Sequence, residues 1–285
     1  MYKHRILIWL YLNFPQVFDV TKLQEIPQFV KQLTSSHPDL DCVFLNSGIQ
    51  RGLDFTKPES IDLDAISMEM NTNYISFLHL TTAFLPFFQK QDKQTAIIYT
   101  TSGLALSPIL RCANYCASKA ALHHFILVLR EQMKNGPGNV NIIEIFPPAV
   151  QTELHDEKNQ PDIKNGNSIG IPLSQFTDEA WDGLSSGKDQ IPVGMSKNSF
   201  DTWEQDRQKM FHKIVEMMKN NPVWIAKTNE INSISSVIYL IWEHQAKYDI
   251  CYLCKIFNFS CDVLIGYSYK GWILEIDDFD GLLKV

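Results

Sequence analysis

Three short runs of apolar residues, separated by two long helical stretches, constrain the fold of this chain more than any other feature. The runs span residues 40–45, 95–100 and 141–146, and each is followed by a turn-forming segment. Apolar spacing predicts helices over about 62–88 and 114–134 between them. Strands that alternate with helices of this length form βαβ units, which build a parallel sheet with helices on both faces. The sequence therefore predicts an α/β fold with a doubly wound parallel sheet.

The residues that follow each predicted strand are candidates for a binding site. Asn46 follows the first run, Ser102 follows the second and Thr152 follows the third. Ligands of open parallel sheets bind beyond the carboxyl ends of the strands. We therefore expect these scattered polar residues to gather at one edge of the sheet.

Three further helices and one long loop are expected in the same part of the chain. Apolar residues recur at three- and four-residue intervals over 21–34, with a capping-box spacing at its start. Helices are also expected over about 174–184 and 200–219. Residues 155–173 are polar and contain glycine and proline, as a substrate loop would.

Composition places the chain among ordinary globular proteins. Of its 285 residues, 45% are hydrophobic and 20% are charged, which excludes a disordered protein, a collagen-like fibre and a coiled coil. The net charge of −7 disfavours nucleic acid as the main partner. No apolar run approaches the roughly 20 residues of a membrane-spanning helix. We therefore expect neither a nucleic-acid nor a membrane partner.

The character of the sequence changes near residue 220. Aromatic and cysteine clusters without a clean period occupy residues 223–285. We therefore predict one domain over residues 1–220 and a C-terminal extension of unknown role over residues 221–285.

The first residues of the chain have two interpretations. A basic segment, residues 1–5, precedes the apolar run Ile6–Leu12, which is the order of a secretory signal. No small-residue cleavage site follows, because Asn13-Phe14-Pro15-Gln16 comes next. We therefore expect a buried strand or an irregular start.

The cysteines do not predict a metal site. Cys251 and Cys254 form a Cys-x-x-Cys pair with Cys261 nearby, but His244 is the only nearby fourth candidate and its spacing fits no zinc pattern. We expect no bound metal. The six cysteines are instead interpreted as reduced, mostly packed thiols of a cytoplasmic protein.

One constellation in the sequence carries acid–base chemistry. Tyr115 and Lys119 stand four residues apart, so they share one face of the predicted helix. A cation beside the phenol favours the phenolate and lowers the pKa of the tyrosine from about 10 toward the range of a general acid–base. Ser102 adds a second hydroxyl at a strand end. A solvated helix face and a serine that caps a turn are the structural alternatives.

With these residues and four further segments, the chain resembles the short-chain dehydrogenase/reductase family over residues 17–220. Asn46-Ser47-Gly48 is similar to the Asn-Ala-Gly turn of the family, and Asn73 with Thr81 and Pro86 is similar to the helix of its structural asparagine. The segment Pro147 to Thr152 is similar to the Pro-Gly-x-x-x-Thr segment of the family, with Pro148 in place of the glycine. Asp19-Val20 is similar to the end of its third strand.

The resemblance implies a Rossmann-like sheet and an NAD(P)-dependent oxidoreductase that reduces a carbonyl or oxidises an alcohol. By that resemblance Tyr115 donates a proton to the carbonyl oxygen of the substrate. Lys119 lowers the pKa of the tyrosine and holds the nicotinamide ribose. Ser102 hydrogen-bonds the carbonyl, and Asn73 orders a water molecule in the proton relay.

The resemblance also implies a set of cofactor contacts, with NADP or NAD as the cofactor. The residues implied are Asp19, Asn46, Gly48, Tyr115, Lys119 and Thr152. Two site residues have simpler explanations. Asn73 beside Asn71 could satisfy a kinked helix, and Thr152 could cap a helix that begins at Glu153.

The sequence departs from the family pattern at its start. The family opens with a strand and a glycine-rich turn, whose backbone amides lie against the pyrophosphate of the cofactor. In this chain the first glycine is Gly48, so the resemblance is to a member lacking its first βαβ unit. The residue that selects NAD or NADP belongs to that unit, so the sequence does not distinguish between the two cofactors. Ile6–Leu12 could supply one replacement strand, and the tail from Val223 could cover exposed apolar surface.

Two function hypotheses follow from this pattern. The first is a dehydrogenase or reductase acting on a small carbonyl or alcohol compound. The second is a catalytically inactive family member or an interaction module without cofactor binding. In the family, the helices that carry Asn73 and Tyr115 pack against a partner subunit, so a homodimer is expected there. Apolar residues available for it are Leu122, Phe125, Ile126 and Leu129, which core packing explains equally well.

The sequence contains a weak indication of the substrate. Phe176, Trp181 and Trp203 lie in the region that shapes the substrate pocket of the family. These bulky side chains favour a hydrophobic carbonyl compound.

Overall fold

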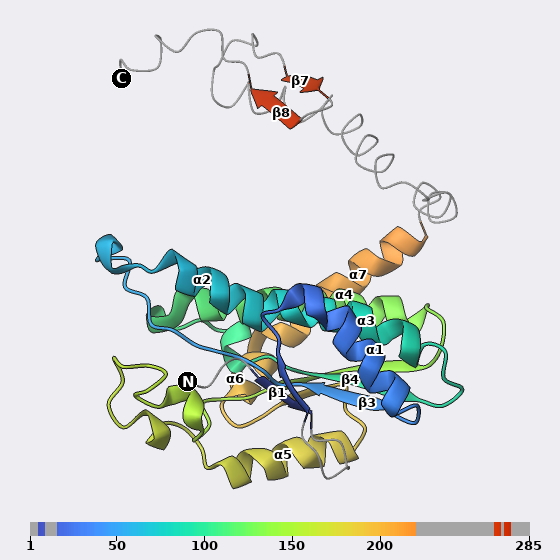
Figure 1. The fold of residues 1–285 in the computed structure, drawn as a ribbon, viewed down its shortest axis with the longest axis horizontal. Coiled ribbons are helices and arrows are strands. Elements are labelled where there is room, and N and C mark those ends of the chain that lie inside the picture. Colours follow the sequence, from blue (N-terminus) through green and yellow to red (C-terminus); the bar gives the residue numbers. More distant parts are fainter. Residues whose placement is uncertain (1–4, 9–15, 221–264, 269–270, 275–285) are drawn as a thin grey trace. The chain divides into compact units, whose positions relative to one another are not determined.

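The computed structural model describes four stretches of the chain, residues 5–8, 16–220, 265–268 and 271–274. Figure 1 shows their helices and strands in sequence order. Within these stretches, no helix is both long and apolar enough to cross a membrane.

The chain divides into two compact units, one within residues 1–209 and one within residues 210–285. The first unit contains the parallel sheet and the helices that pack on it. In the second, the described residues include the strands β7 (Ile265–Ser268) and β8 (Gly271–Leu274), which pair antiparallel. The division at residue 220 stays a prediction.

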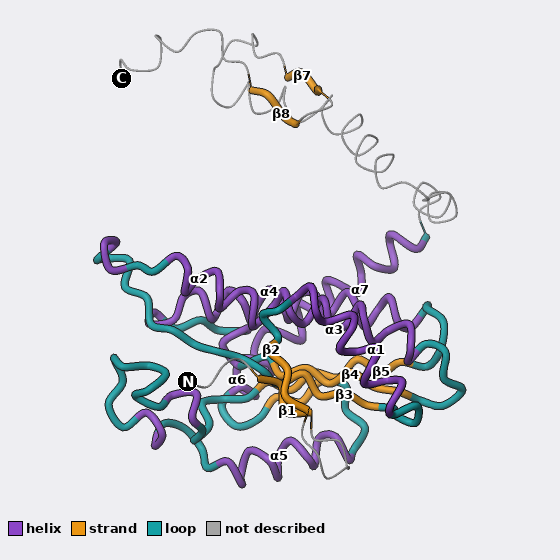
Figure 2. The backbone as a smooth tube through the Cα atoms, viewed as in Figure 1, coloured by secondary structure: helices purple, strands orange, loops and turns teal. Residues whose placement is uncertain are grey.

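A parallel sheet of four strands, in the order β3-β4-β5-β6, forms the centre of the first unit. The strands are β3 (Cys42–Leu45), β4 (Thr95–Thr100), β5 (Val140–Phe146) and β6 (Gln190–Pro192). Every neighbouring pair is parallel. Figure 2 shows the strands side by side between layers of helices. The predicted Rossmann-like α/β fold is therefore confirmed, as is the position of its first three strands.

The strand predicted near the N-terminus does not join this sheet. Residues 6–8 of the proposed replacement strand lie in β1 (Arg5–Ile8), and residues 9–12 lie outside the described residues. β1 pairs antiparallel with β2 (Gln16–Asp19). The expectation of a replacement strand in the parallel sheet is therefore wrong for the described part of this segment, because β1 and β2 form a separate two-stranded sheet. The apolar tail from Val223 lies largely outside the described residues.

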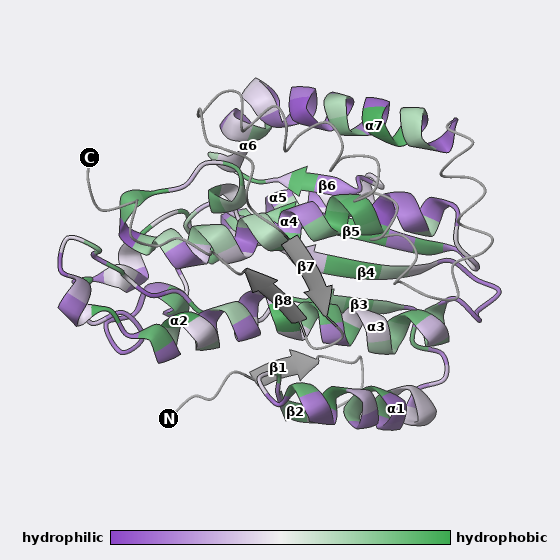
Figure 3. Ribbon diagram, turned by 90° about the horizontal axis from the view of Figure 1, so that it is seen from above, coloured by the Kyte–Doolittle hydropathy of each residue, from purple (hydrophilic) through white to green (hydrophobic). Residues whose placement is uncertain are grey.

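Three helices cover one face of the sheet and enclose the main core. They are α1 (Ile26–Ser36), α3 (Ser76–Phe88) and α4 (Ala113–Lys134), all above the sheet in Figure 1. Each presents apolar residues at helical spacing, and apolar residues of the strands complete the core. Figure 3 shows β4 and β5 largely in the green of hydrophobic residues. The buried residues include Phe29, Val43, Leu45, Phe77, Leu80, Phe84, Ile97, Leu122 and Ile126.

The opposite face of the sheet is covered by α5 (Leu173–Ser185), and only in part. A smaller core forms there from Ile98, Ile145, Ala180, Ile191 and Val193. This core reaches β4, β5 and β6 but not β3.

On that face of β3 the side chains remain open to solvent. Val43 and Leu45 point into the main core, whereas Cys42 and Phe44 alternate to the other side. Phe44 is 47% exposed. Among the described residues, β3 is therefore an edge strand with one uncovered face.

The helix predicted over 62–88 has the predicted extent but is not continuous. It consists of α2 (Leu63–Met70), a π-helical turn (Asn71–Ile75) and α3. Asp62 caps its start by accepting hydrogen bonds from the backbone N–H groups of Asp64 and Ala65. Single π-turns within α-helices occur frequently at functional sites.

Two other helix predictions need correction at their starts. The helix predicted over 21–34 begins as a 3-10 turn, Leu23–Glu25, before α1. Thr21 does not form a capping box, because its hydroxyl donates to the carboxylate of Asp19 instead. The helix predicted over 200–219 begins with a second π-turn, Phe200–Glu204, and continues as α7 (Gln205–Lys219). The short elements β6 and α6 (Ser196–Ser199) were not predicted.

Candidate active site

Four predicted catalytic residues come together from three elements of the covered face. Tyr115 and Lys119 lie one turn apart on α4, Ser102 follows β4, and Asn73 lies in the first π-turn. Each of these residues is at most 6% exposed. The i, i+4 spacing puts the tyrosine and the lysine on one face of α4, so the expectation of a solvated helix face is not met.

Asn73 joins the π-turn to two other parts of the site. Its Oδ1 accepts from the backbone N–H of Ile49 at 2.9 Å, and its Nδ2 donates to the carbonyl of Ile49 at 2.8 Å. The same Nδ2 donates to the hydroxyl of Ser118 on α4 at 3.1 Å. The side-chain amide therefore pairs with both backbone groups of Ile49, as a neighbouring strand would. It also connects the turn after β3 to α4, the helix of Tyr115.

Lys119 is held with its ammonium group in a largely apolar position. Its Nζ donates to the carbonyl of Thr100 at 2.9 Å and lies 5.8 Å from the ring centre of Tyr115. Burial lowers the pKa of this lysine to about 8, and the carboxylates of Glu144 and Glu69 act in the opposite direction. The lysine therefore carries a charge at neutral pH that the protein holds near the phenol.

The pKa of Tyr115 is shifted in the direction opposite to the one predicted. Burial raises the pKa of the phenol above its ordinary value, and the hydroxyl of Ser102 opposes this shift. The predicted net lowering is wrong for this structure, because desolvation of the phenol outweighs the interactions that favour the phenolate. Ser102 also accepts from the backbone N–H of Leu104 at 3.1 Å, so it caps a turn as well.

The turn after β3 brings Asn46 and Gly48 to the same place. A Cβ atom at Gly48 would lie 3.5 Å from both the Oδ1 of Asn73 and the Nζ of Lys119. The backbone therefore leaves room between these two polar groups. Asn46 is exposed, and its Oδ1 accepts from the hydroxyl of Thr100 at 2.7 Å. The buried hydroxyl of Ser47 has no hydrogen-bond partner.

Asp19 and Thr152 each make hydrogen bonds within the turn in which they lie. The carboxylate of Asp19 accepts from the backbone N–H and the hydroxyl of Thr21, which shapes the turn after β2. The hydroxyl of Thr152 accepts from the backbone N–H of Leu154 at 3.4 Å and so caps a 3-10 turn. The helix-capping explanation of Thr152 is met in this form.

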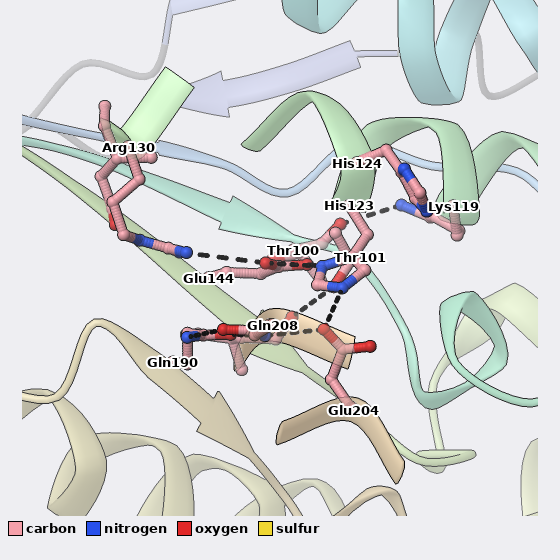
Figure 4. A network of polar contacts seen from close by, with 12 residues as sticks. Thr100, Thr101, Lys119, His123, His124, Arg130, Glu144, Gln190, Glu204 and Gln208 are labelled. Atoms are coloured by element: carbon pink, nitrogen blue, oxygen red, sulfur yellow. Dashed lines mark hydrogen bonds and ion pairs between the residues drawn. The ribbon is translucent and has the colours of Figure 1, made fainter. Parts of the chain in front are cut away.

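A buried ionic network continues the same face of α4 beyond Lys119 (Figure 4). His123 Nδ1 lies 2.9 Å from the carboxylate of Glu144 on β5, and His123 Nε2 lies 3.0 Å from that of Glu204 in the second π-turn. Arg207 donates to the other oxygen of Glu204 at 2.7 Å. Burial opposes a charge on His123, but the two carboxylates outweigh it and raise its pKa to about 9. The guanidinium of Arg207 lies 2.6 Å from His123 Nε2, and together with the imidazole it offsets the two buried carboxylates.

A second polar cluster anchors the loop predicted to cover the substrate. Arg111 donates to both oxygens of Asp162, at 2.8 and 2.7 Å, and to the Oε1 of Gln160 at 2.6 Å. Gln160 is fully buried and donates to the Oε1 of Gln50 at 3.2 Å. Beside it, an open cavity of about 600 Å³ is lined by Gly52, Leu53, Asp54, Ser60, Leu110, Arg111, Pro161 and Asp162. Residue 111 therefore connects the start of α4 to the loop.

Sequence reasoning missed both polar clusters. Gln160 sits in a polar loop, where nothing distinguishes a buried amide from an exposed one. Glu144 gave a signal, since it interrupts an otherwise apolar strand, and His123 stands one turn beyond Lys119 on the same face. A charged residue inside a strand with two covered faces requires a partner, and the helix spacing identifies it.

Other predicted side chains lie away from these clusters. Phe176 packs in the smaller core beneath the sheet, Trp181 is mostly exposed on α5, and Trp203 packs against Arg207. They therefore give no support for a hydrophobic substrate.

The apolar residues offered for a dimer contact on α4 lie inside the chain. Leu122, Ile126 and Leu129 are buried in the main core, and Phe125 packs against it. Core packing therefore accounts for these four residues, and the homodimer stays a prediction.

Among the described residues, no group of three or more histidine, cysteine, aspartate or glutamate side chains is placed to hold a metal ion. Cys251, Cys254, Cys261 and His244 lie outside the described residues.

Comparison with known proteins agrees with this fold. The family of short chain dehydrogenases matches residues 13–163, which is more than half of the chain. The chain belongs to the short-chain dehydrogenase family of oxidoreductases.

Two curated relatives and one solved structure illustrate the similarity. The uncharacterized oxidoreductase DltE of Bacillus subtilis is 34% identical over 180 residues, covering 62% of this chain and 68% of that protein. The NADP-dependent 3-hydroxy acid dehydrogenase of Schizosaccharomyces pombe is 30% identical, covering 54% of this chain and 60% of that protein. A short chain dehydrogenase of Burkholderia cenocepacia in complex with NADP superimposes with a TM-score of 0.54 at 23% identity, covering 69% of this chain and 78% of that one. The last likeness shows the fold.

Proposed function

We propose that this chain is an NAD(P)-dependent oxidoreductase that reduces a carbonyl group, or oxidises the corresponding alcohol, with Tyr115 as the acid–base. The convergence of Tyr115, Lys119, Ser102 and Asn73 around the backbone of Gly48 carries the proposal. The family to which the chain belongs supports it.

In the reductive direction, the phenol of Tyr115 donates its proton to the carbonyl oxygen of the substrate. The phenol of Tyr115 carries its proton at neutral pH, and the burial that raises its pKa opposes the release of that proton. Ser102 holds the same carbonyl oxygen by a second hydrogen bond. The charged Lys119 stabilises the phenolate that proton transfer leaves behind, which raises the rate by lowering the energy of the transition state.

The residues around Gly48 fit the nicotinamide end of a dinucleotide. The space that a Cβ atom would fill lies between Asn73 and Lys119, and the exposed amide of Asn46 borders it. Lys119 and Asn46 would hold the ribose there, and Asp19 and Thr152 would contribute further contacts. When bound, the nicotinamide supplies the hydride. A relative and a solved neighbour are named with NADP, and the proposal admits NAD as well.

The pyrophosphate end of a dinucleotide has no comparable fit. No glycine precedes Gly48 in this sequence, so the described residues offer no glycine-rich turn for two phosphates. The second candidate function is an interaction module that keeps the fold of the family without binding a cofactor.

A fluorescence titration of the folded, full-length chain with NADPH and then NADH separates the two candidates. Saturable binding in the micromolar range is expected for the oxidoreductase. Absence of binding up to millimolar cofactor, with a native circular dichroism spectrum, would contradict the oxidoreductase.

If cofactor binds, turnover of a panel of small ketones, aldehydes and alcohols tests the role of Tyr115. Tyr115→Phe is expected to lower kcat by about 10²- to 10⁴-fold with cofactor affinity unchanged. Tyr74→Phe is the matched control, because it removes a hydroxyl from the π-turn of Asn73 but not from the site. Equal activity of Tyr115→Phe and Tyr74→Phe would contradict the assignment.

A further inference from the structure

Two cysteines enclose the catalytic tyrosine in the sequence and touch each other in space. The sulfur atoms of Cys112 and Cys116 lie 3.9 Å apart, and both residues are buried beside Tyr115. Cys112 ends the 3-10 turn Leu110–Cys112, and Cys116 lies in the first turns of α4. No part of the proposed carbonyl chemistry uses either thiol.

From this geometry we propose that Cys112 and Cys116 form a redox-sensitive dithiol, which hydrogen peroxide converts to a disulfide. The thiolate of Cys116 attacks one oxygen of the peroxide, the O–O bond breaks, and Cys116 becomes a sulfenic acid while hydroxide leaves. The sulfur of Cys112 then attacks the sulfenic sulfur, its thiol proton combines with the departing hydroxide, and water leaves. Two thiols are oxidised and one peroxide is reduced to two waters.

The backbone at Cys112 allows the two sulfur atoms to approach. In a regular helix the Cβ atoms of residues four apart are about 5–6 Å apart, whereas a disulfide needs about 3.5–4.5 Å. Cys112 is not in a helical conformation, since it precedes α4 with φ −128° and ψ 61°. Its side chain can therefore close the gap by a local rotation that leaves the rest of α4 in place.

The contact between the two thiols gives Cys116 and Cys112 different pKa values and therefore different roles in the oxidation. The contact with the sulfur of Cys112 lowers the pKa of Cys116, although burial acts in the opposite direction. The same contact raises the pKa of Cys112. A thiolate is the nucleophile in such reactions, so Cys116 reacts first and Cys112 resolves the intermediate.

Only one short turn separates the thiols from solvent. Leu110 is fully exposed and Ile109 is about half exposed, while the carbonyl of Ile109 lies 4.0 Å from the sulfur of Cys116. Leu110 and Arg111 also line the open cavity described above. Local opening of a single 3-10 turn, which costs far less than global unfolding, admits a molecule of the size of peroxide.

Cys42 provides an internal comparison. It is an exposed thiol on the open side of β3, but partial desolvation and the neighbouring Asp41 raise its pKa to about 11. At neutral pH it holds far less thiolate than Cys116. If exposure alone decided reactivity, Cys42 would be oxidised first, whereas the proposal predicts the reverse order.

Trypsin provides a direct test on the unaltered full-length chain. Cleavage after Arg111 and Lys119 releases the peptide 112–119, which contains both thiols and no other cysteine. After brief treatment with hydrogen peroxide and quenching with a thiol-alkylating reagent, the peptide is expected to be unalkylated and lighter by two hydrogen atoms. Reduction before alkylation restores two alkylated thiols. Doubly alkylated peptide 112–119 at peroxide doses that oxidise Cys42 would overturn the proposal.

Two single variants test the division of roles. Cys112→Ser is expected to accumulate a sulfenic acid at Cys116 that dimedone captures, because the resolving thiol is absent. Cys116→Ser is expected to leave Cys112 unoxidised under the same conditions. Equal dimedone capture at the remaining thiol of both variants would contradict the order of attack, and no capture in either would contradict the site.

The expected consequence for activity rests on the proposed function. Closing the disulfide changes the packing of Cys112 and Cys116 against the ring of Tyr115, so oxidation is expected to lower carbonyl turnover at least tenfold and reduction to restore it. The mass measurement does not depend on turnover, so an inactive chain with an oxidisable peptide would reject the proposed function and leave the redox site intact.

Discussion

Helices cover the two faces of the parallel sheet to different extents. Beneath α1, α3 and α4 the strands are sealed, and aromatic side chains such as Phe84 are 1% exposed or less. On the other face α5 covers β4, β5 and β6, while Phe44 on β3 is 47% exposed. Every catalytic candidate belongs to the sealed face or to the strand ends beside it. The geometry of the candidate site therefore depends on one half of the layered structure.

The difference between the two faces separates the geometry of proton transfer from the affinity for a cofactor. The sealed face holds the proton-transfer residues in place, because Asn73 and Lys119 are bonded to backbone groups of neighbouring turns. The open face belongs to β3, which lies at the edge of the described parallel sheet. A chain can thus keep acid–base geometry while its affinity for a cofactor is set elsewhere.

The largest expected effect comes from breaking the sealed face. Phe84→Ala removes a fully buried ring from the main core and is expected to lower the free energy of unfolding by about 3–5 kcal/mol. Urea denaturation followed by circular dichroism measures it. A loss below about 1 kcal/mol would mean that the core beneath α3 is far looser than described.

A second large effect is expected at the buried ionic network. Glu144→Gln removes one carboxylate from His123 and leaves the charged imidazole with Glu204 alone. Removing one partner of a buried ion pair costs about 3 kcal/mol or more. Glu157→Gln, at an exposed position, is the control and is expected to change stability by less than about 0.5 kcal/mol. Similar losses in both variants would argue against the network.

The pH dependence of stability tests the same network more finely. The pKa of His123 is raised from 6.5 to about 9 in the folded chain. A raised pKa contributes stability that is fully present below the unfolded value and is lost as pH rises to 9. The wild type is therefore expected to lose more stability between pH 6.5 and 9 than His123→Gln does.

The difference between these two proteins is the quantity to measure, by urea titration at several pH values. Lys119 and Cys116 also have shifted pKa values, but they titrate in both proteins and largely cancel. The other groups that face His123 are Glu144, Glu204, Arg207 and His124. Parallel pH profiles for the two proteins would show that the imidazole is not charged in the folded state.

The smallest effect is expected on the open face. Phe44→Ser replaces a half-exposed ring on β3 and is expected to change the free energy of unfolding by about 1 kcal/mol or less. The comparison with Phe84→Ala in the same assay measures how unequal the two faces are. A loss as large as that of Phe84→Ala would indicate that another segment covers Phe44 in solution.

The sequence was sufficient for the fold and for the acid–base pair, for reasons that particular residues make clear. Tyr115 and Lys119 are four apart on a helix, so spacing alone puts them on one face. Runs such as Thr95–Thr100 are apolar on both sides, as parallel strands require. By contrast, β6 has three residues and carries too little pattern to be recognised.

The direction of the pKa shift at Tyr115 could not be derived from the sequence. It depends on how deeply the ring is buried and on where the ammonium of Lys119 points, which are tertiary properties. The same holds for Gln160, whose burial results from the partners Arg111 and Gln50, far away in the sequence. Local propensity does not encode such contacts.

The two π-turns have a consequence for how this chain can change in length. Each places a fully buried polar residue, Asn73 in one and Glu204 in the other. A π-turn accommodates an extra residue, so deleting one residue there would rotate the following helix by about 100° relative to the preceding one. In the first case the phenylalanines of α3 would leave the core together with the amide of Asn73. A single-residue insertion or deletion near either turn therefore displaces a whole helical face, whereas a substitution changes one side chain.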